Sequence, residues 1–191
     1  NFSFGDYFKE GAIEMSFRFL ADELGIPVGN LWVSCFAGDA DAPRDDEAAA
    51  VWRKLGIPED RIVYLGKDEN WWGPAGQTGP CGPDTEMFIE RDQAPCGRNC
   101  GPGCSCGKFV EVWNDVFMQY NKTAEGEFRP LAQKNVDTGM GLERMTAVLQ
   151  NKPSPYQTEL FVPLFETLAE ITGEDAPHNT QSGRVIAEHM R

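Results

Sequence analysis

The stretch FVEVWNDVFMQYN, residues 109–121, reads as a long β-strand. TEMFIE, residues 85–90, reads as its antiparallel partner, and a Cys-rich loop joins the two. Outward from this pair, strands and helices are mixed, without the regular alternation of strand and helix that is typical of parallel sheets. We therefore expect an α+β fold built on an antiparallel sheet.

The other elements are predicted from apolar periodicity and from the glycines that end a run. Strands are expected at residues 1–8, 30–36 and 61–66, and helices at 8–24, 42–56, 139–151, 163–172 and 182–191. The segment 70–83, rich in Trp, Gly and Pro, is expected to be irregular.

The composition is that of a globular domain: 41% of the 191 residues are hydrophobic, enough for one sizeable core. No apolar run approaches the roughly 20 residues that cross a bilayer. We therefore expect no membrane association and a cytoplasmic location. The net charge of −13 should repel a phosphate backbone, so this chain alone should bind nucleic acid poorly. Because the chain begins with Asn1 rather than Met, we expect it to be part of a longer protein.

NVDTGMGLERM, residues 135–145, places two glycines where a helix is expected to begin. A glycine costs a helix about 1 kcal/mol relative to alanine, which suggests that a ligand approaches the backbone here. Arg144 lies off the apolar stripe of the helix and should lean over Gly141. A nucleotide ring or phosphate could then sit beneath the guanidinium. The alternative is that Glu143 and Arg144 are surface charges.

VDTGMGLERM also resembles motif 3 of class II aminoacyl-tRNA synthetases, in the form found in those that charge alanine. Four further stretches agree and occur in the family's order: NFSFGDYFKE, TGPCGP followed by TE, EVWNDVFMQYN and SGRVIAEHMR. The resemblance implies a class II antiparallel sheet flanked by helices, which holds ATP and is incomplete at both ends of this chain. It also places motif 1 and the motif 2 arginine before Asn1, and tRNA-recognising helices after Arg191.

For ATP, the resemblance implies that Arg144 and a phenylalanine sandwich the adenine, above the open backbone at Gly141. NFSFGDYF resembles the second strand of motif 2, so either Phe2 or Phe4 could supply the ring. The alternative is that both are core aromatics.

For the amino acid, the resemblance assigns Asp137 and Asn114 to hold alanine. An ammonium group needs a fixed carboxylate, which agrees with Asp137. Gly139 matches a glycine that keeps the pocket small, and Trp72 matches a tryptophan that lines it. Trp71 is expected to pack in the interior.

The resemblance also implies that Glu111, with Asn114, is a candidate ligand for the magnesium ion that accompanies ATP. The two residues are three apart, and strict alternation would send them to opposite faces of a strand. The assignment therefore needs a β-bulge. The alternative is that Glu111 is a solvent-facing strand residue.

The insert at about residues 94–107 carries Cys96, Cys100, Cys104 and Cys106, spaced C-x3-C-x3-C-x-C. Four thiolates in a short loop suit tetrahedral zinc, here a structural site remote from the chemistry. Disulfides and free thiols remain alternatives, and the resemblance does not supply this site.

Two further cysteines, Cys35 and Cys81, are expected to be small buried residues. Relatives commonly read GPCGPC where this chain has Cys81 but Asp84, which puts a metal at Cys81 in doubt.

The expected activity is ATP-dependent activation of L-alanine to alanyl-adenylate and its transfer to tRNA(Ala). Residues 1–177 would belong to the catalytic domain and 178–191 would begin a helical tRNA-recognition region. This chain alone is not expected to be fully active. The alternatives are a paralogue that charges another acceptor or none, and a zinc-stabilised binding module without activity.

Overall fold

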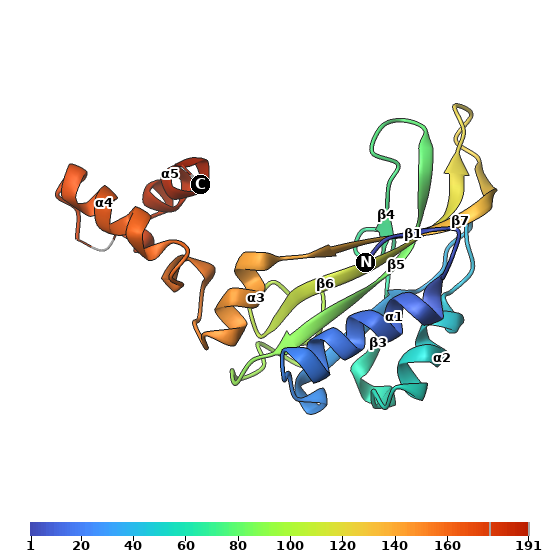
Figure 1. The fold of residues 1–191 in the computed structure, drawn as a ribbon, viewed down its shortest axis with the longest axis horizontal. Helices are drawn as coiled ribbons and strands as arrows, with labels where there is room; N and C mark the ends of the chain where they lie inside the picture. The colour runs from blue at the N-terminus through green and yellow to red at the C-terminus, as the bar shows by residue number, and fades with distance from the viewer. Residues whose placement is uncertain (176, 191) are drawn as a thin grey trace. The chain divides into compact units, whose positions relative to one another are not determined.

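A computed structural model describes residues 1–175 and 177–190, and in that part of the chain the strands form a single seven-stranded sheet (Figure 1). The strand order is β1-β7-β6-β5-β2-β3, with β4 beside β5. Neighbouring strands are antiparallel except β2 and β3. The strands are β1 Ser3–Phe4, β2 Leu31–Phe36, β3 Ile62–Leu65, β4 Trp71–Trp72, β5 Gly79–Glu90, β6 Phe109–Lys122 and β7 Phe128–Met140. The expected α+β fold is confirmed.

The chain divides into two compact units, Asn1–Met140 and Gly141–Arg191, which are described separately. The functional boundary expected near residue 177 stays a prediction. Ala176 and Arg191, which belong to the two predicted regions, lie outside the described residues.

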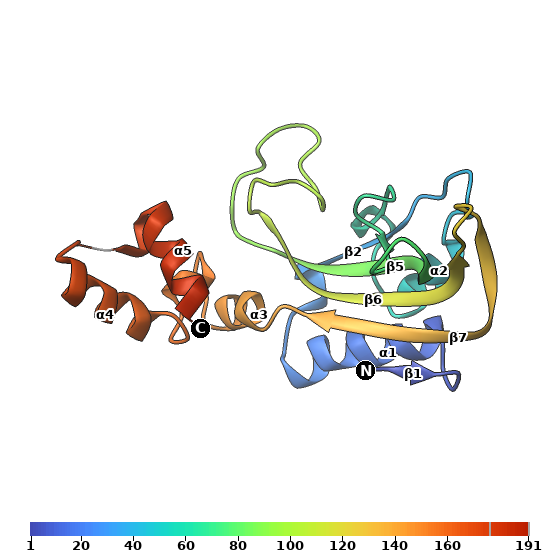
Figure 2. The same cartoon turned by 90° about the horizontal axis from the view of Figure 1, so that it is seen from above.

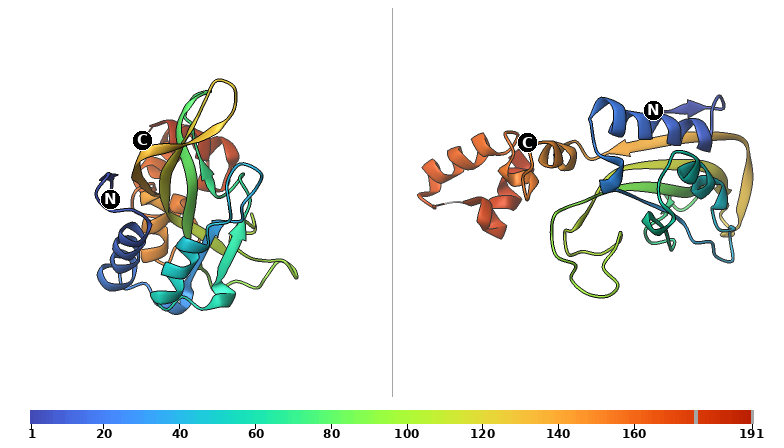
Figure 3. Two further views of the ribbon diagram at one scale, coloured as in Figure 1. Left: turned by 90° about the vertical axis from the view of Figure 1, so that its right-hand side faces the viewer. Right: turned by 90° about the horizontal axis from the view of Figure 1, so that it is seen from below.

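In the first unit, the helices α1 (Lys9–Arg18) and α2 (Asp46–Lys54) cover one face of the sheet (Figures 2 and 3). Ser16 of α1 donates its hydroxyl hydrogen bond to Asp115 of β6, at 2.8 Å. Trp52 of α2 donates its indole N–H to Thr85 of β5, also at 2.8 Å. Thr85 and Asp115 are partners across β5 and β6, so both helices contact the same face. The opposite face of the sheet is called the far face below.

Apolar burial between these helices and the sheet forms the main core. Its largest fully buried side chains include Trp52, Phe36, Phe117, Ile13, Leu20, Met87 and Val33. A buried ion pair ties the start of α1 to the N-cap of α2, because Lys9 Nζ lies 2.6 Å from Asp45 Oδ1. The same carboxylate accepts the backbone N–H of Ala48, which caps α2.

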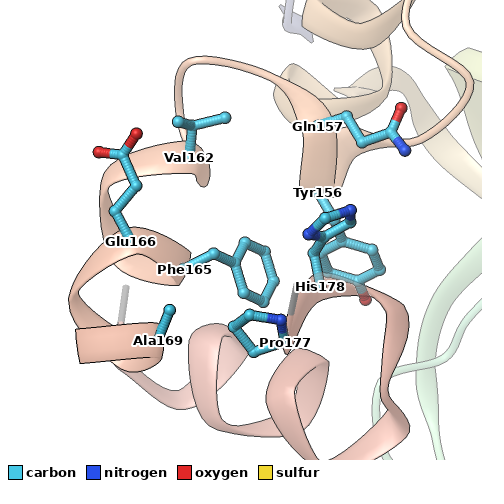
Figure 4. Close-up of a pocket in the computed structure, with 8 residues that line it drawn as sticks. All are labelled: Tyr156, Gln157, Val162, Phe165, Glu166, Ala169, Pro177 and His178. Carbon is cyan, nitrogen blue, oxygen red and sulfur yellow. The ribbon is translucent and has the colours of Figure 1, made fainter. Parts of the chain in front are cut away.

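The second unit is helical, with α3 Leu142–Leu149, α4 Val162–Thr172 and α5 Gln181–Met190. Phe161, Phe165, Leu168 and Ala187 form its small core. Beside this core, the aromatic rings of Tyr156, Phe165 and His178 border a mostly apolar cavity of about 320 Å³ (Figure 4).

Several predicted boundaries are wrong. Only Ser3–Phe4 of the strand expected at 1–8 is extended, and the helix expected at 8–24 changes at Phe19 into a π-helical turn, Phe19–Glu23. The helix expected from Gly139 begins at Leu142, because Asn135–Met140 pair with β6 as the end of β7. In the segment expected to be irregular, β4 and the first half of β5 are strands.

Candidate active site

Asn114 and Gly139 lie side by side on the far face. They are partners across β6 and β7, and Glu86 of β5 is the partner of Asn114 on its other side. Successive side chains of a strand point to opposite faces. Because the next residue, Asp115, points to α1, Asn114 points to the far face. Its cross-strand partners Gly139 and Glu86 lie on the same face.

The backbone of Gly139 fixes the orientation of the Asn114 side chain. The Gly139 N–H donates to Asn114 Oδ1 at 2.8 Å. The amide oxygen is thus used, and the Nδ2 donor is directed elsewhere. A Cβ atom at position 139 would lie only 2.9 Å from Asn114 Oδ1, so a larger residue would displace this amide. The pair therefore presents a fixed hydrogen-bond donor beside an open backbone.

Asp137 lies two residues before Gly139 on β7 and so on the same face. Its cross-strand partner is Val116, two residues after Asn114. The carboxylate is half-buried and makes no hydrogen bond or ion pair with the residues that the structure describes. A partly desolvated carboxylate of this kind suits a cationic ligand group.

A β-bulge brings Glu111 to the far face with Asn114. Trp113 of β6 pairs with Met87, whereas Glu111 pairs with Phe88, so Val112 is an extra residue on β6. Glu86 and Phe88, two apart on β5, share a face, and so do their partners Asn114 and Glu111. The bulge that a joint role of these two residues requires is therefore present.

Sequence reasoning missed two carboxyl groups at alternate positions of β5, the buried Asp84 and the half-buried Glu86. Burial raises the pKa of Asp84 to about 7, against a hydrogen bond from Asn70 Nδ2 at 2.9 Å that lowers it. Burial also raises the pKa of Glu86 to about 8, with the Asp84 and Glu111 carboxylates as further causes. The far face therefore carries two carboxyl groups that can hold protons near neutral pH. The only sequence signal for these two carboxyl groups was their i, i+2 spacing, which puts both on one face of a strand.

The two neighbouring tryptophans of β4 have different environments. Trp71 stacks on Tyr120 with ring centroids 5.7 Å apart and also packs against Phe36, so it is a half-buried packing residue, in agreement with the prediction that it packs. Trp72 pairs with Gly82 of β5 and keeps 38% of its surface exposed. Trp72 therefore has ring surface available to a ligand.

Neither candidate adenine-binding phenylalanine belongs to the core: Phe2 is 61% exposed and Phe4 is 85% exposed. The core alternative is wrong for both, and the choice between them stays open. In the second unit, the Arg144 side chain lies over Gly141, since a Cβ at Gly141 would lie 3.2 Å from Arg144 Cδ. The predicted lean of Arg144 over the glycine is therefore present.

The four-cysteine cluster (Cys96, Cys100, Cys104 and Cys106) lies in the loop between β5 and β6. Its Sγ atoms all lie within 4.8 Å of one another, so the residues could bind a metal ion. Hydrogen bonding among the thiols raises the pKa of Cys96 to about 12, and the backbone N–H of Lys108 lowers that of Cys106 to about 7. All six cysteines of the chain are free thiols. Cys35 and Cys81 are buried, as predicted.

Comparison with known proteins adds a family. The family described as "tRNA synthetases class II (A)" matches residues 1–191. Over the whole chain, the sequence is 53% identical to the alanine–tRNA ligases of Treponema denticola and Treponema pallidum and 48% identical to that of Borreliella afzelii. The chain spans about a third of the length of these relatives (33%, 32% and 33%). In residues 1–175 and 177–190, no helix is long and apolar enough to cross a membrane.

Proposed function

Since this chain belongs to the class II (A) tRNA synthetases, we propose that the protein containing it is an alanine–tRNA ligase. The observation that carries the proposal is the group of Asn114, Gly139 and Asp137 on the far face. It offers an oriented amide donor, an open backbone and a carboxylate that has no partner among the residues that the structure describes. These are the groups that a small zwitterionic amino acid needs.

In this proposal, alanine binds with its ammonium group at Asp137 and its carboxylate near Asn114 Nδ2. Gly139 and Trp72 limit the space for the side chain. A carboxylate oxygen of alanine attacks the α-phosphorus of ATP; a new O–P bond forms, and the bond to pyrophosphate breaks. The residues act by positioning and by charge stabilisation, without a general base. The alanyl group then passes to tRNA(Ala), and AMP leaves.

Arg144, above Gly141, is proposed to contact the adenine of ATP with its planar guanidinium. Phe2 or Phe4 is proposed as the aromatic ring for adenine, since an exposed aromatic ring can stack on a base. Glu111 is the proposed carboxylate ligand of magnesium, which would neutralise charge on the phosphates. The shared face of Glu111 and Asn114 supports this assignment.

The remaining partners follow from charge and donor chemistry. With a net charge of −13, this chain is a poor surface for tRNA, so tRNA(Ala) is proposed to bind mainly through other regions of the protein. The cytoplasm is the proposed compartment. The four-cysteine cluster is proposed to take zinc rather than magnesium, because thiolates favour softer ions.

Exchange of labelled pyrophosphate into ATP, measured on the full-length protein, tests the activation step. We expect exchange with alanine at a kcat/KM about 10- to 200-fold above that with glycine, since one methyl group in a small pocket contributes about that much. No exchange with alanine, or equal exchange with glycine, would contradict the proposal. Exchange without charging of tRNA(Ala) would instead support a paralogue with another acceptor.

A further inference from the structure

A fully buried asparagine, Asn70, directly precedes the two-residue strand β4 and bonds to two other strands. Its Nδ2 group donates one hydrogen bond to Ser34 Oγ of β2 at 2.8 Å and another to Asp84 Oδ1 of β5 at 2.9 Å. Its backbone N–H donates to Gly66 O at 2.8 Å, and its backbone C=O accepts the N–H of Asp84 at 3.2 Å. Asn70 therefore ties the start of β4 to both β2 and β5.

One polar atom of this arrangement lacks a hydrogen-bond donor. Asn70 Oδ1 is buried and accepts no hydrogen bond from the residues that the structure describes. A buried oxygen without a donor loses its hydration and gains nothing in return. Ser34 directs its hydroxyl hydrogen to Glu86 Oε2 at 3.4 Å, so it does not supply the donor. The other side chain that bonds to the amide is Asp84, which is only 3% exposed.

We propose that Asp84 carries a proton in the folded protein and forms a cyclic acid–amide pair with Asn70, which positions Trp72 for alanine binding. In this pair, Asn70 Nδ2 donates to Asp84 Oδ1, and the Asp84 Oδ2 hydroxyl donates to Asn70 Oδ1. A carboxylic acid and a primary amide match in this way, because each places one donor beside one acceptor. The pair supplies the missing donor and leaves no net charge in the buried site.

The surroundings of Asp84 favour the protonated acid. Burial raises the pKa of this group to about 7, although the hydrogen bond from the amide lowers it. Lys67, the cation of the segment that leads into β4, lies 3.0 Å from Asp39 Oδ2 and is neutralised there. The charged groups on the elements packed around Asp84 are otherwise acidic and disfavour a further negative charge: Glu86 on β5, Glu111 and Asp115 on β6, and Glu69 beside Asn70.

The pair lies next to the point where β4 joins the sheet beside β5 (Figure 1). Trp72 pairs with Gly82, two residues before Asp84, and Asn70 precedes Trp72 by two residues. Because β4 has only two residues, its position depends on the contacts at its ends. A shift of Asn70 would therefore move Trp72. The effect on alanine binding rests on the proposed function, which places Trp72 in the alanine pocket, whereas the acid–amide pair does not.

Pyrophosphate exchange by the full-length protein between pH 6 and 9 tests the effect on alanine. We expect the KM for alanine to rise at least about fivefold as Asp84 loses its proton, because only the protonated fraction holds Trp72 in place. The KM for ATP should change much less. Asp84→Asn restores both hydrogen bonds without a proton that titrates, so its KM should stay near the parent's value at pH 6. Asp84→Ala should have a raised KM throughout.

The comparison of the parent with Asp84→Asn at each pH isolates Asp84, because Glu86 is present in both proteins. Parallel pH profiles of these two proteins would overturn the proposal. So would an Asp84→Asn variant that behaves like Asp84→Ala or does not fold, since an amide at this position should reproduce the pair. If the parent shows no exchange with alanine, the proposed function fails, and the pair is then decided by spectroscopy.

Infrared difference spectra of the full-length protein test the pair without any substrate. We expect the carbonyl band of a protonated carboxylic acid to be lost as pH rises from 6 to 9, with one group fewer contributing in Asp84→Asn. Asp60→Asn is the matched control, because Asp60 is exposed and should give the parent's spectrum. Identical difference spectra for the parent and Asp84→Asn would mean that Asp84 is already ionised at pH 6, which would overturn the proposal.

Discussion

Gly139 determines where Asn114 presents its amide, so these two residues are best regarded as one functional group. The glycine contributes an N–H that holds Asn114 Oδ1 at 2.8 Å, and a Cβ at this position would displace that oxygen. If the proposed alanine pocket is here, the space for the substrate and the direction of the Asn114 donor would change together when Gly139 is replaced.

Gly139→Ala should raise the KM for alanine and lower kcat in pyrophosphate exchange, by roughly 100-fold in kcat/KM, because misplacement by about 1 Å can cost that much. The KM for ATP should change little. Gly29→Ala is the control, since a Cβ there meets no atom within 4 Å. An unchanged kcat/KM for alanine in Gly139→Ala would remove Asn114 and Gly139 from the proposed pocket.

Asp137→Asn should weaken alanine binding while ATP binding stays largely intact. The substitution keeps the shape of the side chain and removes the charge opposite the ammonium group. Losing one partner of a buried charge pair costs about 2–5 kcal/mol, and since Asp137 is half-buried we expect the lower end, about 30-fold in KM. The exposed Asp60→Asn is the matched control, and exchange at ordinary alanine concentrations should distinguish the two variants. A near-normal rate for Asp137→Asn would refute the assignment.

The position of β5 within the sheet changes the acidity of its carboxyl groups. Glu86 faces Ser34 of β2 on one side and Asn114 of β6 on the other, with Asp84 two residues away. Partial burial between these neighbours is the main reason that the pKa of Glu86 rises to about 8.

Glu86→Gln should make the protein's stability less dependent on pH between about 5 and 8. A carboxyl group with a raised pKa binds its proton more tightly in the folded state. The folded state therefore loses stability as pH rises from the ordinary glutamate pKa to about 8. Glutamine imitates the protonated form. We expect the variant to match the parent near pH 5 and to exceed it at pH 8 by an amount of order 1 kcal/mol. Urea unfolding at both pH values measures the difference; a constant difference across the range would contradict the shift.

The elements also show what the sequence could and could not predict. Residues 109–121 and 85–90 alternate or are apolar enough to read as strands, and both are strands. The sequence predicts a helix from Gly139, where the structure has the end of β7, because Asp137 and Gly139 stand where an ordinary strand would carry apolar residues. The local strand signal is therefore weak there, and pairing with β6 sets the conformation.

The candidate site could be proposed only in part from the sequence, for a similar reason. Asn114, Asp137, Gly139 and Arg144 could be proposed because they belong to recognisable motifs. Asp84 and Glu86 were missed, because their significance depends on burial between strands that lie far apart in sequence. Only the register of the sheet shows that Glu86 and Asn114 are neighbours. The sequence shows that Glu111 and Asn114 need a β-bulge between them in order to share a face. Only the pairing with β5 places that bulge at Val112.

The acidic surface of the whole chain limits its affinity for tRNA. Its net charge is −13, with 30 acidic and 17 basic residues. Affinity for nucleic acid comes largely from lysine and arginine that displace counterions from phosphates. A chain with this excess of carboxylates has little of that driving force, so we expect it to bind tRNA weakly on its own.

The 191-residue chain alone should therefore bind tRNA(Ala) more weakly than about 100 µM at physiological salt, the weak end of non-specific binding, and should not charge it. Filter binding and charging assays on the isolated chain, with the full-length protein as the control, measure both. The salt response adds an independent check. A protein that neutralises several phosphates loses affinity steeply as salt rises, whereas salt screens repulsion from an acidic chain and should leave its weak binding unchanged or slightly stronger. Tight binding by the isolated chain with a steep negative salt slope would mean that a basic tRNA surface exists within residues 1–191 despite the overall charge.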